Sequence, residues 1–117
     1  MTQFSNLQKE QLKSVAVPIW KNIIAASQAH DYAKFSRGFS SELLSKLSED
    51  HFRESCKDFP LLTTIAPDFE LIDSIHREKG MTILWRLTST TYSGEFLGML
   101  TLQAGEAGME ITGVSVN

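Results

Sequence analysis

The sequence predicts a single α+β domain, in which N-terminal helices pack on a strongly curved antiparallel sheet formed by the second half of the chain. Apolar residues recur at helical spacing as far as Pro60, whereas from Phe69 onward they alternate with a period of two and glycines interrupt the pattern. The connections between the alternating segments are short, which favours an antiparallel meander. With 117 residues, 42% of them hydrophobic and 21% charged, the chain has the size and composition of one globular domain covering residues 1–117.

The first predicted helix begins at Ser5, which forms a capping box with Gln8. Pro18 lies inside the helical pattern and lacks a backbone donor, so we expect a kink there or a break that starts a second segment. Trp20 and Ile24 widen the apolar stripe, as expected of a helix that lies across a core. The stripe itself consists of Leu12, Val15, Ala16, Ile19, Ile23 and Ala26.

Shorter helices follow, starting with the segment HDYAKFSRGFS at residues 30–40. Asp31 is placed to cap one short helix, and Ser40 and Ser48 are placed to cap two more. Pro60 closes the last of them. Because His and Asp residues at helix ends mostly act as caps, we interpret residues 30–40 as a corner between helices rather than the rim of an active site.

Four strands are predicted in the second half, and the loop between the first two leaves their register open. A three-residue loop over residues 78–80 places Asp73 opposite Trp85 on the inner face of the sheet. A two-residue loop, Lys79–Gly80, instead pairs Asp73 with Arg86 on the outer face. The strands cover residues 69–78, 81–91, 95–104 and 109–116.

The inner face of this sheet carries apolar residues that only packing against the helices can remove from water. Gly98 and Gly113 lie on it in mid-strand, where glycine allows a strand to bend sharply. Two such positions in neighbouring strands predict a strongly curved sheet, and therefore a cone that leaves a pocket against the helices. The inner face consists of Leu71, Asp73, Ile75, Ile83, Trp85, Leu87, Phe96, Leu100, Leu102, Met109 and Ile111.

The outer face mixes Thr with Leu, Met and Val, whereas a fully solvated face usually carries Lys and Glu. A contiguous patch of this kind usually becomes covered by another surface. We expect a homodimer that forms sheet against sheet, and the alternative is a partly solvated face rich in strand-forming residues. The outer face consists of Thr82, Leu84, Arg86, Thr88, Leu97, Met99, Thr101, Thr112, Val114 and Val116.

Composition and charge argue against several classes of function. The net charge is -3 and the eleven Lys and Arg residues are scattered, so we expect neither nucleic-acid binding nor attachment to a membrane surface. No apolar segment reaches the roughly 18 residues that a membrane-spanning helix needs. The polar N-terminus does not resemble a signal peptide, and we therefore expect a cytoplasmic protein.

Residues that usually hold metals are few and dispersed. Cys56 is the single cysteine, so the chain can form neither an intrachain disulfide nor a cysteine-based zinc site. Its helical spacing from Phe52 and Phe59 predicts a small buried hydrophobic residue instead. The histidines show no i, i+4 pairing, and they are His30, His51 and His76. We therefore expect no metal and no cofactor.

The order of the elements resembles a known superfamily. A long helix ends in AHDYAKF, short helices follow through FSSELLSKLSEDHF, and the meander closes with GMEITGVSV. This order is similar to that of the nuclear-transport-factor-two-like superfamily, the cystatin-like α+β cones that include SnoaL-like polyketide cyclases and ketosteroid isomerases. The pair His30-Asp31 resembles the small residue and Asp that commonly follow the first helix there. The resemblance implies a cavity between sheet and helices and dimerisation through the outer face, but no particular activity.

The catalytic residues of the steroid isomerases do not carry over to this chain. Their catalytic Tyr, about two turns before the helix-ending Asp, falls on Ile23 here. Their general-base Asp falls among the apolar and serine residues 43–47. The resemblance therefore does not imply an isomerase of that type.

Asp73 is the polar residue most informative about function. On the inner face a carboxylate must find donors, stay protonated or face a wet pocket, and a general acid or base uses such a site. The alternative is a cross-strand ion pair or a solvated carboxylate. Trp85 could form the floor of a ligand pocket, and Tyr32 and His30 lie near its expected mouth. The candidate ligand-binding residues are Trp85, Tyr32, His30 and Trp20.

Two classes of function follow from these residues. We favour a small domain that binds an apolar ligand or a partner segment without turnover, because no second catalytic residue accompanies Asp73. The alternative is a small-molecule lyase, isomerase or cyclase that uses Asp73 as its general acid or base.

Overall fold

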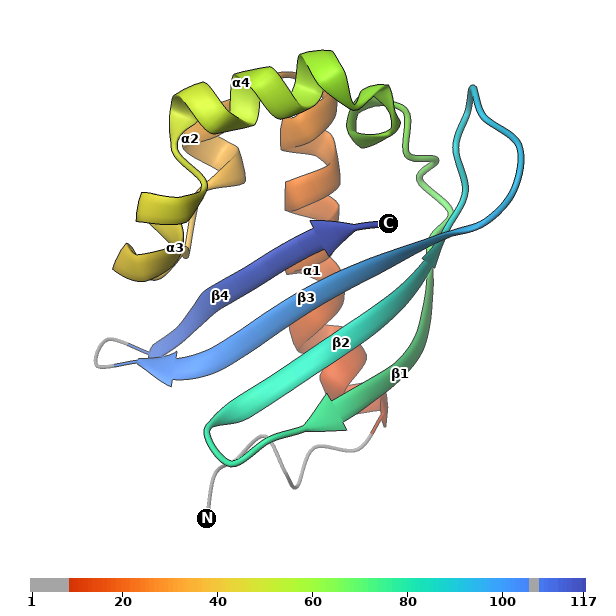
Figure 1. Ribbon diagram of the computed structural model, residues 1–117. Coiled ribbons are helices and arrows are strands. Elements are labelled where there is room, and N and C mark those ends of the chain that lie inside the picture. The colour runs from red at the N-terminus through yellow and green to blue at the C-terminus, as the bar shows by residue number, and fades with distance from the viewer. Residues whose placement is uncertain (1–8, 106–107) are drawn as a thin grey trace.

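The computed structural model describes residues 9–105 and 108–117 and has the predicted α+β order, helices followed by an antiparallel sheet (Figure 1). The elements are α1 (Lys9–Gln28), α2 (Tyr32–Phe35), α3 (Ser41–Lys46), α4 (Glu49–Asp58), the 3-10 helix η2 (Pro60–Thr63), β1 (Glu70–His76), β2 (Gly80–Leu87), β3 (Phe96–Gly105) and β4 (Gly108–Val116). The strands are adjacent in chain order, so the sheet is a meander. α1 crosses one face of the sheet, and no described helix crosses the other (Figure 1).

α1 continues without a break through Pro18. Pro18 is exposed, and the hydrogen bond that it cannot donate would have gone to the carbonyl of Ser14. The capping box predicted at Ser5 and Gln8 lies outside the described residues. Although α1 is 20 residues long, neither it nor another helix of the described residues is both long and apolar enough to cross a membrane.

The corner after α1 is a helix end of the Schellman type. His30 has a left-handed backbone, with φ of 55°, and its N–H donates to the Ser27 carbonyl over 3.2 Å. The N–H of Asp31 reaches the Ala26 carbonyl over 2.9 Å. Asp31 Oδ1 then accepts from the backbone N–H of Lys34 and caps α2. The prediction of a corner capped by Asp31 is confirmed.

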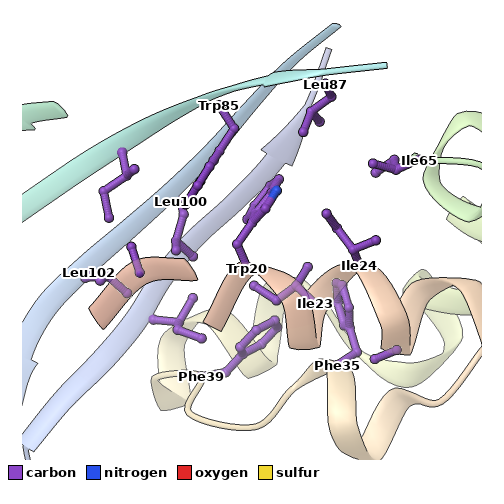
Figure 2. Close-up of a cluster of buried hydrophobic side chains, with 14 of the residues drawn as sticks. Trp20, Ile23, Ile24, Phe35, Phe39, Ile65, Trp85, Leu87, Leu100 and Leu102 are labelled. Atoms are coloured by element: carbon purple, nitrogen blue, oxygen red, sulfur yellow. The ribbon is translucent and has the colours of Figure 1, made fainter. Parts of the chain in front are cut away.

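The core is centred on two stacked indole rings, those of Trp20 from α1 and Trp85 from β2 (Figure 2). Their centroids are 5.4 Å apart, their planes differ by 9°, and both side chains are fully buried. Phe69 packs its ring edge-on against Trp85. A Cβ atom at Gly98 would lie 2.6 Å from Cζ2 of Trp20, so a glycine is needed where the indole lies on β3.

The register of the first hairpin differs from both predicted registers, because Arg77 donates its N–H to the Gly80 carbonyl over 2.8 Å and the loop is therefore Glu78–Lys79. This turn places Asp73 opposite Leu84, and a bulge between Leu71 and Asp73 then returns Leu71 to the inner face, opposite Trp85. Asp73 and Ile75 consequently lie on the outer face, where both are exposed. The predictions that placed these two residues on the inner face are wrong.

A second register shift lies between β3 and β4, where Thr112 is an extra residue. The residues that follow it change faces, as a one-residue shift requires. Val114 and Val116 therefore pack against the core, and Gly113 lies beside Thr101 on the outer face. The outer-face positions predicted for Val114 and Val116, and the inner-face position predicted for Gly113, are wrong.

β2 is shorter than predicted. It ends at Leu87, which pairs with Phe96. The next residue, Thr88, turns its carbonyl toward the N–H of Ala66, which donates to it over 2.8 Å. Thr88 therefore lies outside the paired part of the sheet and does not belong to the outer face where it was predicted.

Candidate functional site

A cavity of about 310 Å³ lies between α4 and the end of β4, and we call it the α4–β4 cavity. α1, α2 and the segment around η2 complete its walls. Most of the lining side chains are apolar, as is usual for a ligand pocket. The lining residues are Ile23, Ser27, Phe35, Leu47, His51, Phe52, Ser55, Phe59, Leu62, Ile65, Val114, Ser115 and Val116.

α4 is held in place by its cap and by one apolar side. Ser48 accepts a hydrogen bond from the backbone N–H of His51 and caps α4, as predicted. Phe52 and Cys56, one turn apart, are buried, and the Phe52 ring centroid lies 4.4 Å from that of Phe35. The burial predicted for Cys56 is confirmed, and it raises the pKa of the Cys56 thiol above its usual value.

Tyr32 joins α2 to the chain that enters α4. Its hydroxyl donates to the Leu47 carbonyl over 2.6 Å, and its ring packs against Phe52 at 5.7 Å. Because a half-buried hydroxyl with a partner on the main chain fixes both segments, Tyr32 supports one wall of the cavity. It does not line the cavity itself.

The polar groups of the cavity are few. Ser27 donates its hydroxyl to the Ile23 carbonyl over 2.8 Å, so its proton is already used. Ser55 is half-buried and His51 is exposed, which places them at the rim. His51 is the one ionisable side chain among the described residues that line the cavity. Such an arrangement can hold an apolar group, and the lining side chains offer a hydrogen bond only at the entrance.

The structure does not bring the four predicted ligand-binding residues together. Trp20 and Trp85 are sealed in the core, and their Nε1–H groups have no hydrogen-bond partner among the described residues. Tyr32 supports the wall of the cavity, and His30 is exposed at the corner after α1. All four residues therefore have roles in the fold.

Asp73 lies on the face of the sheet opposite to the cavity. Its side chain is exposed, and Oδ1 accepts a hydrogen bond from the backbone N–H of Ser74 over 2.8 Å. The cross-strand partner of Arg86 is Glu70 rather than Asp73, with 3.2 Å between Nη1 and Oε2. No cluster of three or more metal-ligating side chains occurs in the part of the chain that the structure describes.

The outer face has an apolar centre beside a charged border. Leu84 and Met99 pair across β2 and β3 and are half-buried at the centre. At the border, Arg86 forms ion pairs with Glu70 and, at 3.7 Å, with Glu95. The residues predicted for this face that the structure leaves on it are Thr82, Leu84, Arg86, Leu97, Met99, Thr101 and Thr112.

A second cavity, of about 350 Å³, lies between α1 and the hairpin of β3 and β4. Ile19 lines it on the side of α1, and Met109 lines it on the side of β4. The two cavities share no lining residue, so a substitution in the second cavity serves as a control for one in the α4–β4 cavity.

Several residues of the α4–β4 cavity were not among the predicted site residues. The helical spacing of Phe52 and Phe59 already indicated an apolar side of α4, and Phe59 remains exposed at the edge of the cavity. The spacing of these two phenylalanines was therefore the signal that the sequence offered. Val114 and Val116 could not be found in this way, because the extra residue at Thr112 reverses their direction.

The chain matches no protein-family model and no curated protein. The resemblance to the nuclear-transport-factor-two-like superfamily therefore stays a prediction that rests on the order of the elements.

Proposed function

We propose that this protein is a binding domain without catalytic turnover, and that it holds an apolar group in the α4–β4 cavity. The observation that carries this proposal is the cavity itself, about 310 Å³ in volume and lined mostly by apolar side chains from helices and sheet. That volume lies at the lower end of the range of roughly 300–1,000 Å³ found for small-molecule sites. Apolar surface that a ligand can cover supplies the driving force for binding.

No observation favours the alternative of a lyase, isomerase or cyclase. A catalytic site needs an acid or base, a group that orients it and a group that stabilises developing charge. Asp73, the proposed acid or base, is exposed on the other face of the sheet. His51 is exposed at the rim of the cavity, and its hydrogen bond to Ser48 is donated by the backbone N–H rather than by the ring.

The test of this function is binding of a fluorescent apolar probe, anilinonaphthalene sulfonate, to the folded protein. Ser55→Trp places an indole in the α4–β4 cavity, and we expect it to weaken probe binding at least tenfold. Ile19→Trp fills the second cavity in the same way and is the matched control, with the Kd expected to stay within twofold. Circular dichroism confirms that both variants are folded. Loss of binding in Ile19→Trp but not in Ser55→Trp would contradict the proposal.

We also propose that two copies associate through the outer face of the sheet. Four strands spaced about 4.8 Å apart and eight residues long present a patch of roughly 500 Å² in projection. With protruding side chains this approaches the area of about 600–800 Å² per partner that a specific interface buries. Ile75 is 46% exposed and Leu97 36% exposed on this face, so association would remove apolar surface from water.

Analytical ultracentrifugation tests the association. The protein is expected to sediment as a dimer, and Leu84→Lys, at the centre of the outer face, is expected to convert it to a monomer. Leu44→Lys changes an exposed leucine on α3 and should leave the dimer intact. A wild-type monomer at all micromolar concentrations would exclude this interface.

A further inference from the structure

The edge of β4 is partly covered by the chain itself. Ile111 donates its N–H to the Gly38 carbonyl over 2.8 Å and accepts from the N–H of Ser40 over 2.9 Å. Phe39 thereby forms a parallel bridge with Ile111. After Ser40 the chain turns into α3, so the pairing stops and the C-terminal half of the β4 edge lies beyond it. This edge therefore already accepts one extended segment.

The hydrogen bonds between β3 and the end of β4 determine which groups of β4 point outward. Leu97 and Asn117 exchange both backbone hydrogen bonds, each 2.8 Å long. In an antiparallel ladder such pairs alternate with pairs that exchange none, so Val116 and Val114 direct their N–H and C=O groups away from β3. Within residues 9–105 and 108–117, no hydrogen bond reaches these outward groups.

These outward groups border the α4–β4 cavity. Val114 and Val116 line it from the sheet, while Phe52 and Ser55 line it from α4. In Figure 1, α4 runs beyond the edge of the sheet that β4 forms. A strand edge with unpaired donors and acceptors beside an apolar cavity combines the two features that bind extended peptides, backbone pairing for affinity and pockets for alternate side chains.

The size of the cavity matches two apolar side chains of such a peptide. A cavity of about 150 Å³ is enough to hold one benzene molecule, and this one measures about 310 Å³. Side chains i and i+2 of a strand point to the same face, roughly 6.6 Å apart. A strand added beyond β4 would therefore direct two side chains at once to the side of the sheet where α1 and α4 lie.

We infer that the ligand of the α4–β4 cavity is an extended peptide segment that pairs its backbone with Val114 and Val116 and places two apolar side chains, at alternate positions, in the cavity. This inference rests on the proposed function, because the side chains occupy the same apolar space. It adds the class of partner and the strand pairing that orients it.

The probe for this inference is a pool of acetylated, amidated seven-residue peptides with Thr at odd positions and Val, Leu or Phe at even positions. The pool is expected to displace anilinonaphthalene sulfonate from the protein. A matched pool carries N-methyl groups on alternate backbone nitrogens, which removes the N–H groups needed for pairing, and is expected to bind at least tenfold more weakly. Equal displacement by both pools would overturn strand pairing.

Two variants of Val116 separate the backbone from the side chain. Val116→Pro removes the outward N–H, and edge strands tolerate proline where the N–H faces away from the neighbouring strand. Val116→Ala keeps the N–H and shortens the side chain. We expect Val116→Pro to weaken peptide binding at least fivefold relative to Val116→Ala, with similar binding of anilinonaphthalene sulfonate in the two variants. Circular dichroism and thermal unfolding show whether both are folded.

The outcomes distinguish failure of this inference from failure of the proposed function. If the small probe binds and Ser55→Trp blocks it, but the peptide pool does not displace it, the cavity binds apolar molecules and the peptide inference is wrong. If neither probe nor peptide binds, both proposals are wrong. If the peptide pool binds the wild-type protein but not the Val116→Pro variant, both the proposed function and the peptide inference are supported.

Discussion

The Trp20–Trp85 stack lies between α1 and the sheet, and the α4–β4 cavity lies between α4 and the end of β4; side chains fill the first region and leave space in the second. Around the stack, α1 lies so close to β3 that only a glycine fits beneath the indole of Trp20. Around the cavity, α4 lies beside the sheet edge, and its phenylalanine, Phe52, contacts Phe35 of α2 instead. The large aromatic residues of the stack are therefore close-packed, whereas space for a ligand remains where α4 passes the edge of the sheet.

The largest effect on stability is expected from adding one methyl group beside the Trp20–Trp85 stack. Gly98→Ala puts a Cβ atom 2.6 Å from Cζ2 of Trp20, whose indole is fully buried and stacked on Trp85 and has little room to move. We expect the free energy of unfolding to fall by about 3 kcal/mol, measured by urea denaturation. Ser55→Trp adds a whole ring in the α4–β4 cavity, and we expect it to lower the free energy of unfolding by less than about 1 kcal/mol. Equal costs for the two variants would abolish the distinction between the regions.

A smaller effect on stability is expected at Tyr32, which supports one wall of the α4–β4 cavity. Tyr32→Phe removes the hydroxyl that donates to the Leu47 carbonyl over 2.6 Å and leaves that carbonyl without its partner. The free energy of unfolding is expected to fall by about 1.5 kcal/mol. Because the ring remains against Phe52, the folded variant should still bind anilinonaphthalene sulfonate. A loss of probe binding in the folded variant would instead make Tyr32 a ligand contact.

At His30, in the corner after α1, a substitution is expected to raise the free energy of unfolding rather than lower it. His30 has a left-handed backbone, which glycine adopts without strain, so His30→Gly is expected to stabilise the protein by about 0.5 kcal/mol. His30→Ala keeps the strain and is the control. Thermal unfolding measures both. Weaker probe binding in His30→Gly would show that the residue contributes to a site as well as to the corner.

The smallest effect concerns Cys56, on the buried side of α4. Burial raises the pKa of its thiol in the folded state above the value of 9.0 that applies when it is exposed. The unfolded chain therefore loses this proton first as pH rises, and the contribution of Cys56 to stability is present below pH 9 and declines above it. Cys56→Ala should show a shallower decline between pH 8 and 10 in urea denaturation. Identical pH profiles would indicate that α4 leaves the thiol accessible.

The order of the elements and the helix caps could be predicted because they depend on neighbours in sequence. Asp31, Ser40 and Ser48 all accept the expected backbone hydrogen bond in the first turn of their helices. Gly98 could also be placed on the inner face, because the residues between it and Leu102 alternate without interruption.

The candidate site could not be predicted because it depends on an extra residue in β4, and the position of Asp73 could not be predicted because it depends on where the first turn falls. A bulge is set by which hydrogen bonds the partner strand offers, and alternation in the sequence does not record it. The turn at residues 78–79 places Asp73 on the outer face, and the extra residue Thr112 in β4 turns Val114 and Val116 to the cavity. The cost of burying an unpaired carboxylate at Asp73 was itself evidence against the regular register.

The most direct test is a titration of isotope-labelled protein with anilinonaphthalene sulfonate, followed by nuclear magnetic resonance of backbone amides and indole N–H groups. We expect shifts for the amides of Phe52, Val114 and Val116, with the indole signals of Trp20 and Trp85 unchanged. Shifts confined to the two indoles, or to Leu84 and Met99 on the outer face, would exclude binding in the α4–β4 cavity.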